Sequence, residues 1–166
     1  AIIAIAPKKV NIKRNKNLML TPKGIKAVKT ITKESLLLPN IVKVTSPTKI
    51  GIPHLDHKIL RISPLLLETS LSDRQKQKII YEPLLKNSLV APDGNTLGIF
   101  LDFGLSSDDN EQIEDTMLAL NNMIINLAKT YPDYVYYVSG SLAGGTAFSE
   151  ATKGDIKEVF PWMAGV

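Results

Sequence analysis

The 166-residue sequence contains no cysteine, which excludes a disulfide framework and any metal site built on thiolates. It also lacks an uninterrupted apolar run of the roughly 20 residues that a helix needs to cross a bilayer, so no membrane helix is expected within this stretch. A GxSxG motif, or any recognisable grouping of nucleophile, base and orienting residue, is missing too. The sequence therefore does not predict an enzyme, and it calls for no cofactor.

The first residue is alanine, and the opening AIIAIAP has neither the basic leader nor the length of a signal peptide. These features indicate a fragment or a processed chain. Hydrophobic residues make up 44% of the sequence and charged residues 22%, the balance of a folded globular chain. The formal net charge of +4 is uneven, because the stretch from Lys8 to Lys33 is basic and that from Asp108 to Asp115 is acidic. The basic stretch has no arginine cluster and no interleaved aromatics, which favours a solvated face over a nucleic-acid partner.

The strongest periodic signals lie between residues 88 and 140. Alternating apolar residues from Leu97 to Phe103 predict a half-buried strand. Apolar residues then recur every three or four positions, as one stripe of a long helix requires: Ile113, Met117, Leu120, Ile124, Leu127 and Tyr131. Pro132 and Asp133 end this helix, and the run from Tyr134 to Val138 predicts a second strand, parallel to the first.

A similar strand, helix and strand unit is predicted over residues 1–46. The apolar run 1–6 predicts a strand buried on both faces, and Thr21-Pro22 marks the N-cap and first position of a helix. The helical stripe consists of Ile25, Val28, Ile31 and Leu36. Residues 41–46 alternate as a strand, with Ile41 or Val42 and Val44 directed inward.

Two such units predict an α+β fold of the ferredoxin-like, split βαβ type, with a four-stranded antiparallel sheet and two helices on one face. Residues 1–46 and 88–140 form this subdomain, and residues 47–87 form an insert. The insert is expected to hold a short helix, because Ser72 and Gln75 have the spacing of a capping box. A turn at APDGN is expected to join 88–91 and 96–103 as a hairpin. Residues 141–166 predict a C-terminal helix that leads to a membrane segment, because the apolar end contains Trp162.

Two local motifs have some of the features of ligand sites. His54, Asp56 and His57 in HLDH could hold a metal in a hydrolase, but no third histidine exists and a plain loop is favoured, so no metal is predicted. The glycine-rich SGSLAGG follows a strand as phosphate-binding loops do, but it lacks the GK[ST] and GxGxxG spacings, which favours a turn. The acidic residues at the start of the long helix complement its dipole and have a structural interpretation.

The order IVKVTSP, SLVAPDGNTLGIFLDF, long helix and YPDYVYYVSGSLAGGTAFSEATKGDIKEVFPWM resembles the first extracytoplasmic domain of exporters of the RND superfamily, especially the MMPL-like and hopanoid-exporter-like branch. The resemblance covers nearly the whole chain and is most specific over 41–46 and 88–161. The matching structural positions are Val44, Ser46, Asp93, Gly94, Gly140, Asp155 and Pro161. The chain departs from many members at 141–143, where a proline often follows the glycine.

The resemblance implies a porter domain between the first and second membrane helices, on the periplasmic side of the cytoplasmic membrane. It implies proton-driven transport, with the proton-relay residues in membrane helices outside this chain. The implied partners are the membrane helices and second extracytoplasmic domain of the same transporter, and a hydrophobic or lipid-like cargo; a homo-oligomer is left open.

The apolar insert would contact this cargo, and the candidate contact residues are Leu60, Ile62, Leu65, Leu66 and Leu67. The alternative for these leucines is a place in the core. The alternative for the whole chain is a free-standing ferredoxin-like module that binds a protein or a ligand and has no membrane part.

Overall fold

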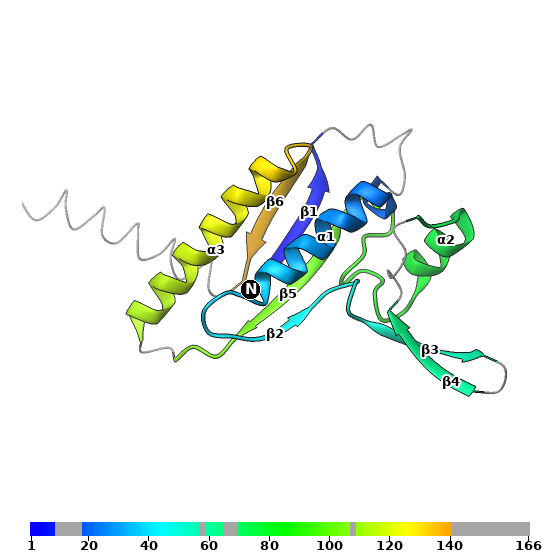
Figure 1. The fold of residues 1–166 in the computed structure, drawn as a ribbon, viewed down its shortest axis with the longest axis horizontal. Coiled ribbons are helices and arrows are strands. Elements are labelled where there is room, and N and C mark those ends of the chain that lie inside the picture. The colour runs from blue at the N-terminus through cyan, green and yellow to red at the C-terminus, as the bar shows by residue number, and fades with distance from the viewer. Residues whose placement is uncertain (9–17, 57–58, 65–69, 107–108, 141–166) are drawn as a thin grey trace, which may run out of the picture.

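The computed structural model describes residues 1–8, 18–56, 59–64, 70–106 and 109–140. Its main sheet has the strand order β2-β5-β1-β6, and every neighbouring pair is antiparallel. The four strands are β1 (Ile2–Pro7), β2 (Ile41–Thr45), β5 (Leu97–Phe103) and β6 (Tyr134–Ser139). The two main helices are α1 (Pro22–Ser35) and α3 (Asn110–Thr130), and they cover the same face of the sheet (Figure 1). This is the predicted ferredoxin-like arrangement.

Strand β1 lies between β5 and β6 and is antiparallel to both. The strands β5 and β6 therefore run in the same direction, as the sequence predicts, but they are not neighbours. The helix α3 connects them across β1, so each half of the chain places its two strands around a strand of the other half. The two halves cannot form separate sheets with this strand order.

The core lies between the sheet and the two helices. Ile3 and Ile5 of β1 pair with Ile99 and Leu97 of β5, and all four side chains are fully buried. The residues between them on β1 are only partly buried. The expectation that this strand is buried on both faces is therefore wrong, because both main helices lie on one side of the sheet.

The predicted helical stripes are confirmed with small corrections. Thr21 caps α1 and accepts a hydrogen bond from the Gly24 amide, and Ile25, Val28 and Ile31 are fully buried. Leu36 is 44% exposed, because the helix ends at Ser35. In α3 the predicted stripe is buried or half-buried throughout.

Strand β2 resolves the alternative at its start. A register shift between Ile41 and Lys43 leaves Val42 74% exposed, whereas Ile41 is half-buried and Val44 is buried. Ile41 and Val44 are thus the inward residues.

The insert contains more regular structure than the sequence predicts. Strands β3 (Gly51–Asp56) and β4 (Ile59–Pro64) pair as an antiparallel hairpin that extends away from the main sheet (Figure 1). The sequence did not predict this hairpin because each of its strands contains a proline. The two-stranded sheet accommodates these prolines, because each strand has one edge that pairs with no other described strand. The short helix is confirmed as α2 (Asp73–Tyr81), with the complete capping box of Ser72 and Gln75.

The second half of the insert completes the core. Ile79 and Ile80 of α2 and Leu85 after it are buried, as are Leu89 and Val90 just beyond the insert, whereas Tyr81 and Leu84 are exposed. The predicted hairpin around APDGN is present in a short form, with one bridge between Val90 and Leu97 and a hydrogen bond from the Gly98 amide to the Leu89 carbonyl at 2.8 Å.

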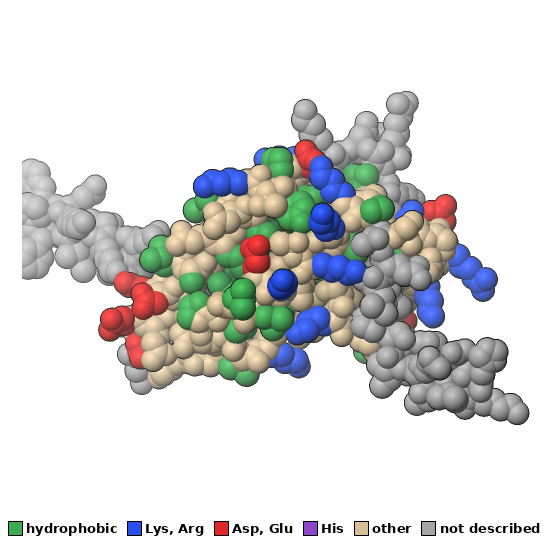
Figure 2. All heavy atoms as spheres, viewed as in Figure 1, with side chains coloured by type: hydrophobic (Ala, Val, Ile, Leu, Met, Phe, Trp, Pro, Cys, Tyr) green, Lys and Arg blue, Asp and Glu red, His purple; other side chains and the backbone are tan. Residues whose placement is uncertain are grey.

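The charge asymmetry of the sequence is visible on the surface. Figure 2 shows acidic side chains gathered where α3 begins and basic side chains over the region of α1 and α2. Among the described residues, no helix is both long and apolar enough to cross a membrane. The predicted C-terminal helix at 141–166, with Asp155 and Pro161, lies outside the described residues.

Candidate functional site

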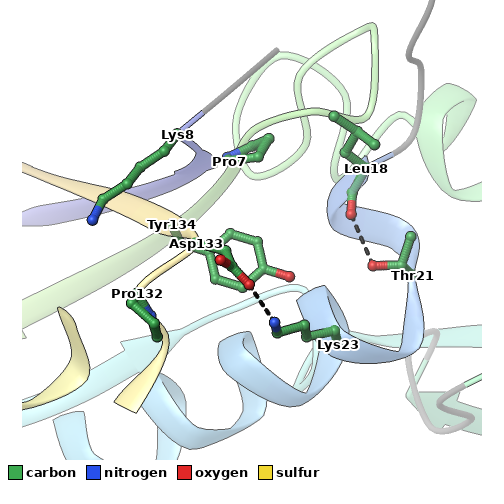
Figure 3. Close-up of a pocket in the computed structure, with 8 residues that line it drawn as sticks. All are labelled: Pro7, Lys8, Leu18, Thr21, Lys23, Pro132, Asp133 and Tyr134. Carbon is green, nitrogen blue, oxygen red and sulfur yellow. Dashed lines mark hydrogen bonds and ion pairs between the residues drawn. The ribbon is translucent and has the colours of Figure 1, made fainter. Parts of the chain in front are cut away.

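A pocket of about 450 Å³ opens where three segments distant in sequence meet. These segments are the end of β1, the start of α1 and the turn between α3 and β6 (Figure 3). The pocket is lined by Pro7, Lys8, Leu18, Thr21, Lys23, Pro132, Asp133 and Tyr134. The sheet brings β1 and β6 together because Pro7 pairs with Tyr134 at this end of the ladder.

Local sequence explains how each wall is formed. The Thr21 hydroxyl donates to the Leu18 carbonyl at 2.9 Å and accepts from the Gly24 amide, so one side chain joins the 3-10 turn η1 (Leu18–Leu20) to α1. On the opposite wall, Pro132 prevents α3 from continuing, and the Lys8 amide donates to the Asp133 carbonyl at 2.8 Å.

An ion pair crosses the pocket between Lys23 of α1 and Asp133 of the α3–β6 turn (Figure 3). The hydrogen bond and charge of each partner raise the pKa of Lys23 and lower the pKa of Asp133. Tyr134 is 5% exposed, and burial raises the pKa of its phenol. The site thus presents two ammonium groups and one paired carboxylate beside proline and tyrosine rings.

This pocket was not predicted from the sequence. Lys23 and Asp133 are 110 positions apart, and no local pattern connects them. The available signals were the TPKG helix start and the YPDY turn, which identified the two walls separately.

The predicted family positions Asp93 and Gly94 lie in the turn before β5, where they have a structural role. The Asp93 carboxylate accepts from the Asn95 amide at 2.9 Å. The Asn95 side chain, which is 4% exposed, in turn accepts from the Leu18 amide at 3.0 Å, and the Gly94 carbonyl accepts from the Met19 amide at 3.2 Å. The turn therefore fixes η1, and through η1 the start of α1 beside the pocket.

Val44 and Ser46 also have structural roles. Val44 belongs to the core, and Ser46 is fully buried, with its hydroxyl 2.9 Å from that of Thr32 on α1. The Ser46 carbonyl accepts the amides of Lys49 and Ile50, so this residue ends β2 and starts the next turn.

Gly140 marks the exit from the sheet. Its φ of +119° is a conformation that favours glycine, and a Cβ built there would lie 3.1 Å from the Ala1 Cα. The glycine therefore allows the end of β6 to pass close to the start of β1.

Leu60, Ile62, His54 and Asp56 belong to the β3–β4 hairpin, which is not one of the three segments that line the described pocket. Leu60 and Ile62 lie on β4, opposite Leu55 and Pro53 of β3. His54 and Asp56 lie on β3, and the part of the chain that the structure describes contains no group of three or more His, Cys, Asp or Glu residues able to hold a metal ion. The candidate residues Leu65, Leu66, Leu67 and His57 and residues 141–145 of SGSLAGG fall outside the described ranges.

No match was found. Comparison with protein-family models, with curated proteins and with solved structures identified no similar family or protein for this chain.

Proposed function

We propose that this chain is an extracytoplasmic domain of a proton-driven exporter of the RND superfamily, inserted between two consecutive membrane helices. Its role would be to form part of the path for lipid-like or amphiphilic cargo. One observation carries the proposal: the chain enters and leaves the sheet at the same point.

The pairing of β1 with β6 establishes this point. Ile2 pairs with Ser139, and Gly140 lies against Ala1. A domain inserted between two neighbouring helices needs its entry and exit close together, because packed helices lie about 8–10 Å apart. The antiparallel pairing of β1 with β6 supports this requirement, because it brings the start of one strand beside the end of the other.

The residues that carry the family resemblance support the same proposal. Asp93 and Gly94 hold η1 in place, and Gly140 forms the exit beside Ala1. Each of these positions supports the geometry of the domain, which is the role expected of residues shared across transporters that carry different cargo.

The insert is the proposed contact with cargo. Its hairpin of β3 and β4 extends from the main sheet and places Leu60 and Ile62 on β4 (Figure 1). The apolar residues from Ile59 to Leu67 would offer contact area to an acyl chain, and rocking of the domain in the membrane-anchored protein would open and close the path.

The location is tested on the full-length chain. We expect an apolar segment of helix length on each side of residues 1–166, and we expect the protein to stay in the membrane fraction during alkaline extraction. Polar flanking sequences and release from the membrane would overturn the exporter proposal and favour the free-standing binding module.

The cargo contact is tested by substituting both Leu65 and Leu66 with Asp in the full-length protein. Export of a fluorescent lipid-like substrate should fall, because two charges would then face the apolar cargo. The matched control is Leu37→Asp, since Leu37 is 80% exposed and lies outside the insert. Equal export by the double variant and the control would remove the insert from the cargo path.

A further inference from the structure

Among the described residues, strand β6 forms an outer edge of the main sheet, and its own sequence has none of the charges or prolines that often protect such an edge. It is last in the strand order, and no other strand in the described ranges pairs with its outer side. Its sequence YVYYVS contains no charged residue and no proline. The opposite edge strand β2 has both Lys43 and a register shift. An edge such as β6 readily pairs with a further strand.

The helix above this edge has an unusual exposed stripe. Leu118 is 62% exposed and Ile125 is 51% exposed, although both are large and apolar. The side of α3 toward α1 is identified by Met123, whose sulfur receives a hydrogen bond from Ser35 at 3.9 Å. At 100° a residue, Leu118 and Ile125 lie about 140–160° around the helix from Met123. The stripe is therefore turned away from α1, and α3 lies over β6 at the same edge of the sheet (Figure 1).

The stripe on α3 is complementary to a second copy of itself that runs in the opposite direction. Glu114 lies four residues before Leu118, and Lys129 lies four residues after Ile125, so the pattern reads acidic, apolar, apolar, basic. Its midpoint falls between Asn121 and Asn122. When two copies of α3 pack antiparallel, Leu118 meets Ile125 of the second copy, and Glu114 meets Lys129 of the second copy.

We propose that β6 and the outer side of α3 form the interface of a two-fold symmetric homodimer. The two β6 strands pair antiparallel and continue the sheet, and the two α3 helices pack antiparallel on one face of it. Four strands about 4.8 Å apart take up about 19 Å of the continued sheet for each chain. If α1 and α3 lie about 10 Å apart and evenly over these strands, about 9 Å remains between the two α3 axes, which is within the range of packed helices.

The self-complementary stripe identifies the partner as a second copy. A strand of an unrelated protein could pair with β6, but such pairing would not explain why the pattern on α3 is symmetric about its midpoint. A two-fold axis, in contrast, requires each residue on one side of the midpoint to match one on the other side, as Leu118 matches Ile125. The inference does not depend on the exporter proposal, because it uses only the β6 edge and the α3 stripe.

The absence of cysteine makes a cross-linking test direct. In residues 1–166, Asn121→Cys places a thiol next to the proposed axis, and mild oxidation should convert most of the protein to a covalent dimer. The control Glu111→Cys lies on the same helix, and its thiols would be about 30 Å apart in an antiparallel pair. Cross-linking at both positions alike, or at neither, would overturn the proposal.

Charge reversal tests the orientation independently by sedimentation. Glu114→Lys or Lys129→Glu alone should weaken the dimer by about tenfold, since two symmetric pairs become like-charged, and the double reversal should restore it. Leu118→Asp should give a folded monomer with an unchanged circular dichroism spectrum, because this side chain is exposed in the single chain. A chain that is monomeric without substitution, or a double reversal that fails to restore the dimer, would refute this interface.

Discussion

Gly24 in the first turns of α1 offers the sharpest test of the packing. Replacing glycine with alanine inside a helix ordinarily stabilises a protein by up to about 1 kcal/mol. Here a Cβ would lie 2.4 Å from the Met19 carbonyl oxygen and 2.9 Å from the Met19 Cα. Both contacts are with backbone atoms, so no side-chain rotation can relieve them.

The backbone of η1 cannot move away easily. The Met19 amide is bonded to the Gly94 carbonyl at 3.2 Å, and the Leu18 amide is bonded to Asn95 at 3.0 Å. Overpacking of this kind costs about 1–3 kcal/mol, which exceeds the gain from helix propensity. We therefore expect Gly24→Ala to lower the free energy of unfolding by about 1–2 kcal/mol and the thermal midpoint by about 2–8 °C.

The measurement is thermal and urea unfolding of residues 1–166 by circular dichroism. The control is Lys26→Ala, an exposed position on the same helix, which should change stability by less than about 0.5 kcal/mol. An increase in the thermal midpoint of Gly24→Ala would refute the reasoning, because it would mean that η1 and α1 are not held at this separation.

Three further perturbations probe the core, the turn and the buried phenol. Leu120→Ala should lower the free energy of unfolding in urea by about 2–5 kcal/mol because Leu120 is fully buried, whereas Asn126→Ala, at an exposed position on the same helix, should change it little. Asn95→Ala should lower the free energy of unfolding by about 1–3 kcal/mol, and it should speed hydrogen exchange of the Leu18 amide, because this amide loses its hydrogen-bond acceptor. Burial raises the pKa of Tyr136 to about 12. The neutral phenol therefore contributes fully to the free energy of unfolding below pH 10, and this contribution is lost between pH 10 and 12, because the phenol ionises first in the unfolded chain. Tyr136→Phe should therefore reduce the alkaline loss of stability.

Each of these expectations has a contrary result. Equal losses of stability for Leu120→Ala and Asn126→Ala would contradict the assigned buried face of α3. Slow exchange at Leu18 after Asn95→Ala would show that the turn does not hold η1. Tyr137→Phe is the control for the pH test, since Tyr137 is 61% exposed, and an equal effect of both tyrosine variants would argue against burial as the cause.

The local elements could be predicted from the sequence because their signals lie within short windows. Thr21 and Pro22 define the start of α1, and the spacing from Ile113 to Tyr131 defines α3. The ferredoxin-like topology followed from the order of these elements, because two strand, helix and strand units pack most simply as one sheet.

Other features depended on contacts that no window contains. The hairpin of β3 and β4 was not predicted because prolines usually indicate loops. The partial exposure of β1 was not predicted because it depends on both helices packing on the same face of the sheet. Gly24 reads from the sequence as a weak position in a helix, and only its approach to Met19 shows why a side chain is excluded.

The sequence by itself determined the periodicities, caps and turns, since each depends on neighbours within one or two turns of the chain. Only the tertiary structure decided that Lys23 meets Asp133, that the chain enters and leaves the sheet at one point, and that β6 is an edge strand of the described sheet. The physical reason is that strand order and helix placement are set by the burial of apolar surface across the whole chain, and this selects contacts without regard to separation in sequence.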